Sequence, residues 1–213
     1  MDFDDFVARS SKIKNLPLPG RASHYKMAPL IRIKAMEEGQ IKNANPKKAG
    51  VLALFYPDGK KDTHLLLILR KSYKGVHSNQ IAFPGGKAEK EDLDIMHTAL
   101  RETHEEVGVP PERISIIKSL SEIYIPPSNF EVKPFMGLAE NPKPFVLQAS
   151  EVAALVEVPL LDFMDESKVF TQKLSTSYAK DMDVPAFKLN GYVVWGATAM
   201  MLNEIKELLK QVL

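Results

Sequence analysis

The chain contains no cysteine among its 213 residues. This absence excludes disulfides, zinc sites built on thiolates, iron–sulfur clusters and cysteine nucleophiles. A reducing compartment is compatible with such a composition.

The sequence has neither an excess of one charge nor a long apolar run. Lysine and arginine number 28 against 27 acidic residues, and 28 − 27 gives a net charge of +1. We therefore expect no nucleic-acid partner, because no basic footprint covers the sequence. Apolar runs such as residues 65–69 are far shorter than the roughly 18 residues that span a bilayer, so we expect no membrane partner. The first residues, MDFDDFVARSSKIK, lack the apolar core of a secretory signal, and the last, KQVL, are not a peroxisomal address. We expect a cytoplasmic protein.

The length and pattern indicate one domain with an N-terminal appendage. We assign residues 1–48 to an N-terminal helix (3–15) and an extension that packs on the core, in which 28–42 are mixed. Residues 49–213 form the main domain. Residues 50–70 predict a β-hairpin with its turn at Asp58-Gly59. Further strands are expected at 81–83, 114–125, 130–138 and 151–158, with a short turn or 3₁₀ segment at 159–165. Segments 169–174 and 184–189 are expected to pair. Helices are predicted at 93–107 and 196–213, and helices packed on a mixed sheet give an α/β (α+β) fold.

The helix at 93–107 carries three carboxylates on one arc. With Ile95 at zero, Glu102, Glu105 and Glu106 fall at about 340°, 280° and 20° at roughly 100° per residue. Glu106 lies nearest the apolar stripe and should be the most buried of the three. The stripe comprises Met96, Ala99, Leu100, Thr103 and Val107. Carboxylates this close repel each other, and hard divalent cations that prefer oxygen ligands relieve the repulsion. A solvated acidic face paired with Arg101 is the alternative interpretation.

A glycine turn precedes this helix at a fixed interval. Phe83-Pro84-Gly85-Gly86 follows a short strand, and two glycines permit close approach to a ligand. The stretch from Gly86, GKAEKEDLDIMHTALRETHEEVGV, resembles the Nudix box, G-x5-E-x7-R-E-U-x-E-E-x-G-U, where U is aliphatic. The residues that match are Arg101, Glu102, Glu105, Glu106, Gly108 and Val109. Thr103 replaces an aliphatic residue, and the interval to Arg101 is one residue longer than in the box. Its first acid therefore has three candidates, Glu91, Asp92 and Asp94; for the last two we favour capping of the helix N-terminus.

The longer interval, with an upstream R…H…Q…FPGG pattern, resembles the coenzyme A pyrophosphatase branch of the Nudix hydrolases. The matching residues are Arg70, His77, Gln80, Phe83, Pro84, Gly85, Gly86, Thr98, Ala99, Leu100, Arg101 and Glu102. Lys74-Gly75 stands where the branch has Leu-Arg, and Asn79 where it has glycine. The resemblance implies a Nudix-type α/β/α sandwich with a mixed central sheet. It also implies hydrolysis of coenzyme A or its derivatives to 3′,5′-ADP and 4′-phosphopantetheine.

The same resemblance implies a set of site residues. Mg²⁺ or Mn²⁺ would be held by Glu102, Glu105, Glu106 and the Gly86 carbonyl. Glu102 is a metal ligand or the general base, Glu105 shares the catalytic site, and Arg101 orients the glutamates. The small-molecule nucleotide substrate would be bound by Arg70, Lys71, Lys74, His77, Gln80 and Gly85. We expect the basic loop at 70–74 to hold a phosphate of the substrate.

Other functions stay open. A Nudix hydrolase of another dinucleotide, such as ADP-ribose or NADH, is one alternative, and a non-catalytic nucleotide-sensing module is another. The isoprenoid isomerase use of the fold needs a catalytic cysteine, which is absent. By analogy we expect a homodimer, and Phe3, Phe6 and Val7 would pack on their own domain or on a second subunit. Trp195 could stack on a base, but a single tryptophan between a strand and a helix is usually in the core, and we expect it there.

Overall fold

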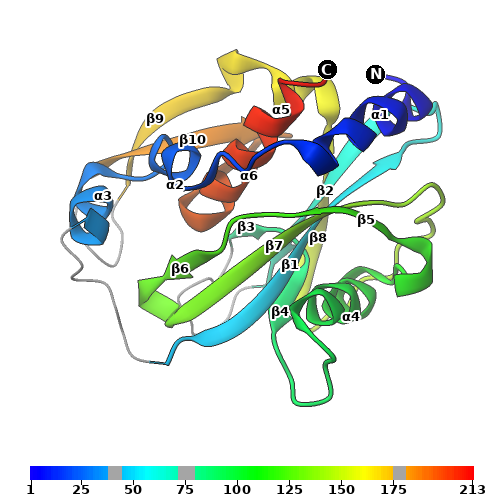
Figure 1. Ribbon diagram of the computed structural model, residues 1–213, viewed down its shortest axis with the longest axis horizontal. Helices are drawn as coiled ribbons and strands as arrows, with labels where there is room; N and C mark the ends of the chain where they lie inside the picture. Colours follow the sequence, from blue (N-terminus) through cyan, green and yellow to red (C-terminus); the bar gives the residue numbers. More distant parts are fainter. Residues whose placement is uncertain (38–44, 72–79, 175–180) are drawn as a thin grey trace.

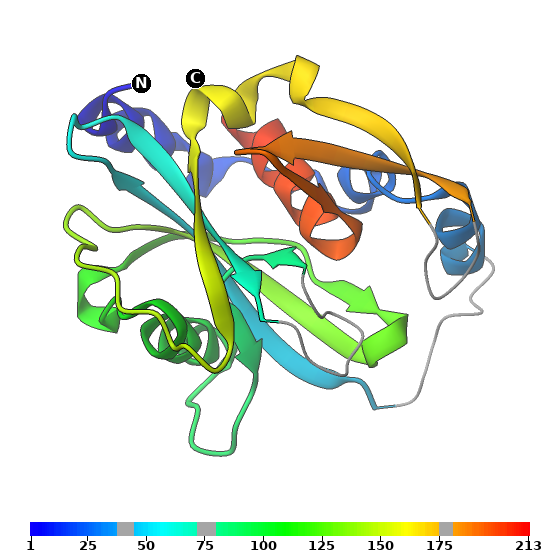
Figure 2. The same ribbon diagram turned by 180° about the vertical axis from the view of Figure 1, so that it is seen from behind.

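A mixed β-sheet lies between two outer layers (Figures 1 and 2). The computed structural model describes residues 1–37, 45–71, 80–174 and 181–213, with the side chains of 35–37 excepted. Helix α4 (Ile95–Val107) covers one face, and α1 (Phe3–Ser10) and α6 (Gly196–Leu209) lie on the other. This confirms the predicted α/β/α arrangement with a mixed central sheet.

Eight strands of the described chain build the central sheet. They run in the order β3-β2-β1-β7-β5, while β4 also pairs with β1, β6 with β7 and β8 with β2. The β1–β7 pair is parallel and the other pairs are antiparallel. The strands are β1 (Lys47–Pro57), β2 (Thr63–Arg70), β3 (Ile81–Ala82), β4 (Gly85–Lys87), β5 (Ser115–Ser119), β6 (Ile123–Ile125), β7 (Phe130–Leu138) and β8 (Val152–Pro159).

The β1–β2 hairpin supplies the centre of the sheet, as the sequence predicts. Its turn is closed by the Asp58 carboxylate, which accepts hydrogen bonds from the Lys60 and Asp62 amides. Residues 52–56 of β1 are fully buried, because layers cover both faces of this strand. Such a strand shows a continuous apolar run rather than alternation.

The single strand predicted at 114–125 is wrong. The chain forms β5 and β6, which pair with different parts of β7. Between them Ser121 turns toward α6, and its amide and hydroxyl both donate to Glu204. An apolar, β-branched run looks the same whether the strand is continuous or interrupted, so the break is invisible in the sequence.

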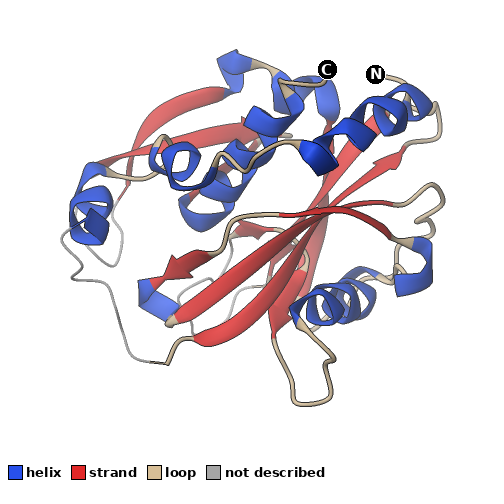
Figure 3. Ribbon diagram, viewed as in Figure 1, coloured by secondary structure: helices blue, strands red, loops and turns tan. Residues whose placement is uncertain are grey.

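The second outer layer also contains a small antiparallel sheet, visible in red in the upper part of Figure 3. Its strands are β9 (Val169–Leu174), β10 (Met182–Leu189) and β11 (Tyr192–Trp195). The predicted pairing of 169–174 with 184–189 is confirmed, with Phe170 opposite Ala186. The remaining helical elements are η1 (Ser11–Asn15), α2 (Gly20–Tyr25), α3 (Leu30–Glu37), η2 (Pro111–Arg113), η3 (Pro126–Ser128), α5 (Leu160–Met164) and η4 (Glu166–Lys168).

The N-terminal segment packs on its own chain. Phe3 and Phe6 are buried, and the Phe6 ring lies 4.9 Å from that of Phe55 between centroids. Farther along, the buried Glu204 carboxylate of α6 accepts hydrogen bonds from the Gly20 amide and faces His24 at 3.2 Å. These contacts fix α2 against α6. Phe3 and Phe6 thus pack on their own domain, one of the two expected arrangements, while the homodimer stays a prediction.

Within the described residues, none of the helices is both long enough and apolar enough to cross a membrane.

Candidate active site

Helix α4 lies unusually close to the sheet because β1 carries a glycine beneath it. A Cβ atom at Gly50 would lie 2.4 Å from the Ile95 carbonyl oxygen and 3.0 Å from the Ala99 amide nitrogen. The helix begins at the cap of Asp94, whose carboxylate accepts from the His97 amide, and ends at Gly108 with φ 77°. The sequence therefore sets both the ends of the helix and its height above the sheet.

The three carboxylates are graded in exposure, as the wheel predicts. Glu106 is 1% exposed, while the side chains of Glu102 and Glu105 are 15% and 48% exposed. Ala99, Thr103 and Val107 of the stripe are buried, but Met96 is exposed. Thr98 is buried instead, because its hydroxyl donates to Asp92. The buried Thr103 hydroxyl donates to the Ala99 carbonyl, which accommodates threonine at an aliphatic position of the box.

The glycine turn brings bare backbone against the Glu102 carboxylate. A Cβ atom at Gly86 would lie 2.4 Å from both the Cδ and Oε2 atoms of Glu102. Gly86 belongs to β4 and is paired with Gly50 of β1. Only glycine leaves room for the carboxylate at this point.

Arg101 holds two of the acids in place. Its Nη1 donates to Glu102 at 3.0 Å and to Glu105 at 3.1 Å. Its Nε and Nη2 donate to Asp92, which is 3% exposed, at 2.9 and 3.0 Å. The Arg101 guanidinium holds the pKa of the Asp92 carboxyl well below its usual range. Of the three candidate acids, Asp92 is therefore the one that pairs with Arg101. The capping role expected for Asp92 is wrong, and that expected for Asp94 is confirmed.

Glu106 is engaged on both oxygens. Oε2 accepts from the Gly85 amide at 2.8 Å, and Oε1 accepts from Arg70 Nη1 at 3.3 Å. Burial raises the pKa of Glu106 to about 7, against the opposing influence of Gly85 and Arg70. Burial also raises the pKa of Glu102, opposed by Arg101. Glu106 therefore ties the end of β2 and the glycine turn to α4.

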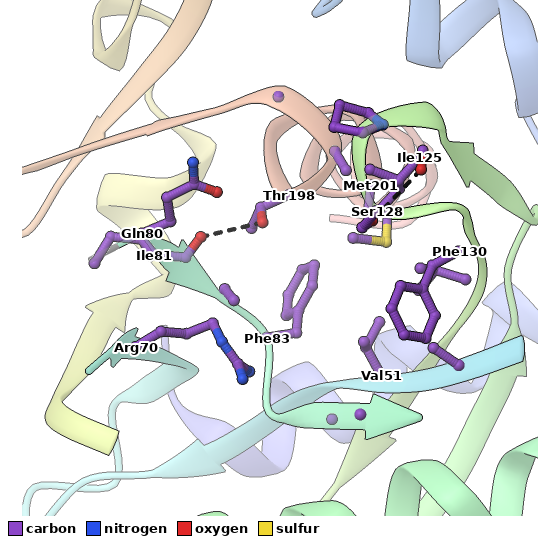
Figure 4. A pocket seen from close by; sticks show the side chains of 18 of the residues that line it. Val51, Arg70, Gln80, Ile81, Phe83, Ile125, Ser128, Phe130, Thr198 and Met201 are labelled. Atoms are coloured by element: carbon purple, nitrogen blue, oxygen red, sulfur yellow. Dashed lines mark hydrogen bonds between the residues drawn. The ribbon is translucent and has the colours of Figure 1, made fainter. Parts of the chain in front are cut away.

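A cavity of about 930 Å³ opens beside these acids (Figure 4). Of the residues that the sequence assigns to the site, six line it: Arg70, Gln80, Gly85, Gly86, Glu102 and Glu105. Glu106 lies behind this lining. Lys71 also lies outside it, and its amino group donates to the Ala149 carbonyl at 2.5 Å. Lys74 and His77 lie outside the described residues.

The sequence did not lead us to expect three parts of the cavity lining. Glu151 lines it, with its carboxylate 4.0 Å from Arg70 Nη2, and its charge helps to raise the pKa values of Glu102 and Glu106. Glu151 directly precedes β8, so only knowledge of the β2–β8 pairing places it here. Trp195, expected in the core, also lines the cavity, as does part of the N-terminal segment at Ile31 and Arg32.

The donor set suits a hard divalent cation. In the part of the chain that the structure describes, no group of three or more acidic or histidine side chains is arranged to hold a metal ion by itself. Glu102 and Glu105 nevertheless present oxygen donors beside the bare Gly86 backbone. Mg²⁺ commonly uses one or two carboxylates and completes its shell with water and substrate phosphates. The residues present therefore fit such an ion in a complex with a phosphorylated substrate.

Comparisons with known proteins agree with this site. A model of the NUDIX domain matches residues 46–172. The chain is 36% identical over 148 residues to the uncharacterized Nudix hydrolase NudL of Pectobacterium atrosepticum, covering 66% of this chain and 72% of that protein. It is 34% identical over 141 residues to NudL of an Enterobacter species, with the same coverage of both chains.

Solved structures share the fold at low sequence identity. A Caenorhabditis elegans Ap4A hydrolase binary complex superposes with a TM-score of 0.52 at 17% identity, covering 78% of this chain and 98% of that one. A MutT/nudix family protein from Enterococcus faecalis gives 0.51 at 16%, covering 88% and 72%. The family-model match and the NudL relatives carry the conclusion, since the structural neighbours show the fold alone. The chain belongs to the Nudix family of hydrolases.

Proposed function

We propose that this Nudix hydrolase cleaves the diphosphate of coenzyme A or its derivatives, giving 3′,5′-ADP and 4′-phosphopantetheine. The observation that carries the proposal is the composition of the cavity. Glu102 and Glu105 lie in its lining together with a largely apolar wall that includes Ile81, Phe83 and Met201. A diphosphate linked to the flexible, weakly polar pantetheine arm suits this combination better than one linked to a second sugar.

The sequence motif supports the same substrate. Arg70 and Gln80, from the pattern resembling the coenzyme A branch, both line the cavity on the side where Ile81 lies (Figure 4). Arg70 lies at the end of β2, where its backbone amide bonds to the Gln80 carbonyl at 3.0 Å. Arg70 thus comes from the end of β2 and Gln80 from the residue before the adjacent β3, and their side chains can contact one half of a substrate.

Glu102 and Glu105, with the Gly86 carbonyl, are the residues that would hold Mg²⁺ or Mn²⁺. We leave Glu106, which was expected to join them, out of this set because both of its oxygens accept hydrogen bonds within the protein. When bound, these ions neutralise charge on the phosphate oxygens and lower the pKa of a water molecule. Gly86 leaves its backbone bare, so the Glu102 carboxylate and a phosphate can both approach it closely. The box carboxylates would then not be enough to hold the ion by themselves, and phosphate oxygens of the substrate would complete its ligands.

Glu102 is also our candidate for the general base, as the alternative to its role as a metal ligand. Its Oε1 is held by Arg101, and its Oε2 lies against Gly86, where it can accept a proton from the attacking water. A carboxylate whose pKa is raised by burial is a better proton acceptor at neutral pH than an exposed one. Arg101 positions Glu102 and Glu105, while the Glu106–Arg70 pair positions the glycine turn.

The proposal is tested by side-by-side turnover of coenzyme A, ADP-ribose and NADH with Mg²⁺, with Mn²⁺ and with EDTA. We expect the highest kcat/KM for coenzyme A and no turnover in EDTA. Faster hydrolysis of ADP-ribose or NADH would refute the coenzyme A assignment and leave a Nudix hydrolase of another dinucleotide. Absence of turnover with all three substrates would favour a nucleotide-sensing module.

A further inference from the structure

Lys87 places a cation at the cavity directly beside the glycine turn. It follows Gly86 in β4 and lines the cavity, and its side chain is exposed. Successive side chains of a strand point to opposite faces. Because a Cβ atom at Gly86 would meet the Glu102 carboxylate of α4, the side chain of Lys87 leaves β4 on the other face. The carboxylate and this lysine thus lie on opposite sides of the same turn.

Strand register shows what lies on the face that Lys87 occupies. Lys87 is opposite Ala49 of β1, and Ala49 is opposite Val132 of β7. Both partners are buried and line the cavity, and so does Phe130, two residues before Val132. Figure 4 shows Phe130 and Val51 along this part of the cavity. The surface beside Lys87 is therefore apolar.

A second lysine lies on the same face. Lys47 precedes Ala49 by two residues in β1, so its side chain points the same way, and its amino group lies 5.7 Å from the centroid of the Phe130 ring. Lys47 is the diagonal cross-strand neighbour of Lys87, a separation of about 7–8 Å that long side chains can bridge. The two amino groups can therefore contact one anion together.

No carboxylate of the described residues forms an ion pair with Lys47 or Lys87. Their neighbour Lys48, by contrast, pairs with Glu131. Two like charges on one face of a sheet repel each other. An anion bound between the two lysines would relieve this repulsion.

Two cations that the sequence assigns to the substrate already have partners. Arg70 faces the carboxylates of Glu106 and Glu151. Lys71 lies outside the cavity lining, and its amino group donates to the Ala149 carbonyl. A phosphate that reaches the cavity beyond the diphosphate is therefore better served by Lys87 than by these two.

We propose that Lys87, assisted by Lys47, binds the 3′-phosphate of coenzyme A and selects this substrate over one that lacks the group. The inference rests on the proposed function, and it replaces the expectation that the loop at 70–74 holds this phosphate. One ribose carries both the 3′-phosphate and the 5′-diphosphate, so the cation for the first must lie next to the site of the second. Lys87 meets this condition, because its Cα lies about 3.8 Å from that of Gly86 and a flexible four-carbon stem carries its charge.

The charge and the surroundings suit this ligand. A phosphate monoester carries close to two negative charges at neutral pH, and charge-assisted contacts to it are strong. With the phosphate between the two lysines, the nucleoside would lie over the apolar surface of Ala49, Phe130 and Val132. Aromatic rings of this kind stack on bases.

The test compares coenzyme A with dephospho-coenzyme A in the wild-type protein and in Lys87→Gln. The substitution removes the charge and leaves in place the Lys87 carbonyl that accepts from Arg101. We expect the wild type to prefer coenzyme A by about tenfold or more in kcat/KM. Lys87→Gln should lose most of this preference through a higher KM for coenzyme A, with dephospho-coenzyme A unchanged within about twofold.

Two further variants complete the comparison. Lys87→Arg keeps the charge and should keep most of the preference. Lys90→Gln is the matched control, because Lys90 is an exposed lysine of the following loop and does not line the cavity. It should leave the kcat/KM of both substrates unchanged within about twofold.

Three results would overturn the inference. One is an unchanged preference in Lys87→Gln, alone and combined with Lys47→Gln. Another is an equal fall for both substrates in Lys87→Gln, which would assign this lysine to the diphosphate. The third is a preference that is kept in Lys87→Gln and lost in Lys71→Ala with Lys74→Ala, which would return the phosphate to the 70–74 loop.

A binding measurement separates failure of this inference from failure of the proposed function. By calorimetry, 3′,5′-ADP should bind the wild type about tenfold more tightly than 5′-AMP, and Lys87→Gln should abolish most of the difference. If the wild type hydrolyses no coenzyme A, the proposed function fails while this measurement still decides the phosphate site. Equal binding of the two nucleotides by the wild type refutes the role of Lys87.

Discussion

Replacing Gly86 by alanine should cost about a hundredfold in kcat/KM without unfolding the protein. The new Cβ would lie 2.4 Å from the Glu102 carboxyl carbon, and ordinary van der Waals contact begins at 3.4 Å. The carboxylate must therefore retreat by about 1 Å, since 3.4 − 2.4 is 1.0. A misplacement of about 1 Å in a catalytic group can cost 10²-fold, or roughly 2.7 kcal/mol of transition-state stabilisation.

The assay is a double-mutant cycle with Glu102→Ala, using initial rates of coenzyme A hydrolysis at saturating Mn²⁺. Gly86→Ala should be nearly neutral once the Glu102 carboxylate is gone, because the clash is then absent. Gly59→Ala is the matched control, since nothing lies within 4 Å of a Cβ at that glycine. Full activity in Gly86→Ala, or an equal loss with and without Glu102, would refute the account of the glycine turn.

Three further predictions concern the acids. Glu106→Gln should lower kcat by at least about 10²-fold, because the carboxylate that accepts from both Arg70 and the Gly85 amide is lost and the glycine turn shifts; unchanged kcat at saturating Mg²⁺ would contradict this positioning role. With 3′,5′-ADP present to supply phosphate oxygens, Mn²⁺ or Mg²⁺ should raise the free energy of unfolding by about 2.7 kcal/mol at 100-fold above Kd, and a thermal melt that does not move favours the solvated acidic face. Burial alone would raise the pKa of Glu204, but hydrogen bonds from His24 and Ser121 lower it overall. The stability from its ionisation is therefore present above the usual carboxyl pKa and lost as pH falls through the lowered value. Urea unfolding of Glu204→Gln should show a lower free energy at pH 7, with a difference from wild type that shrinks on acidification; a constant difference would contradict this.

The box helix was predictable because its information is local. Spacing along α4 determines which acid is buried, and Glu106 is the most buried of the three as a consequence. Asp94 and Gly108 mark the helix ends by their side-chain chemistry and backbone freedom. The β1–β2 hairpin is local in the same sense, since its turn residues lie between two apolar runs.

The rest of the site depends on contacts between distant segments. Asp92 becomes the partner of Arg101 only through the path of the loop before α4. Glu151 reaches the cavity through the β2–β8 pairing, and Arg32 through its contact with Tyr124. No periodicity in the sequence reports these pairings. The sequence therefore predicts the acidic face but not the wall that faces it.

The central claim is most directly tested by identifying the products formed from coenzyme A. The wild-type protein with Mg²⁺ or Mn²⁺ should give 3′,5′-ADP and 4′-phosphopantetheine in equal amounts, measured by chromatography and mass spectrometry. Glu102→Gln, which leaves the Arg101–Asp92 contact in place, should give neither product at a comparable rate. Cleavage at any other bond, or intact coenzyme A after prolonged incubation with both metals, would contradict the account.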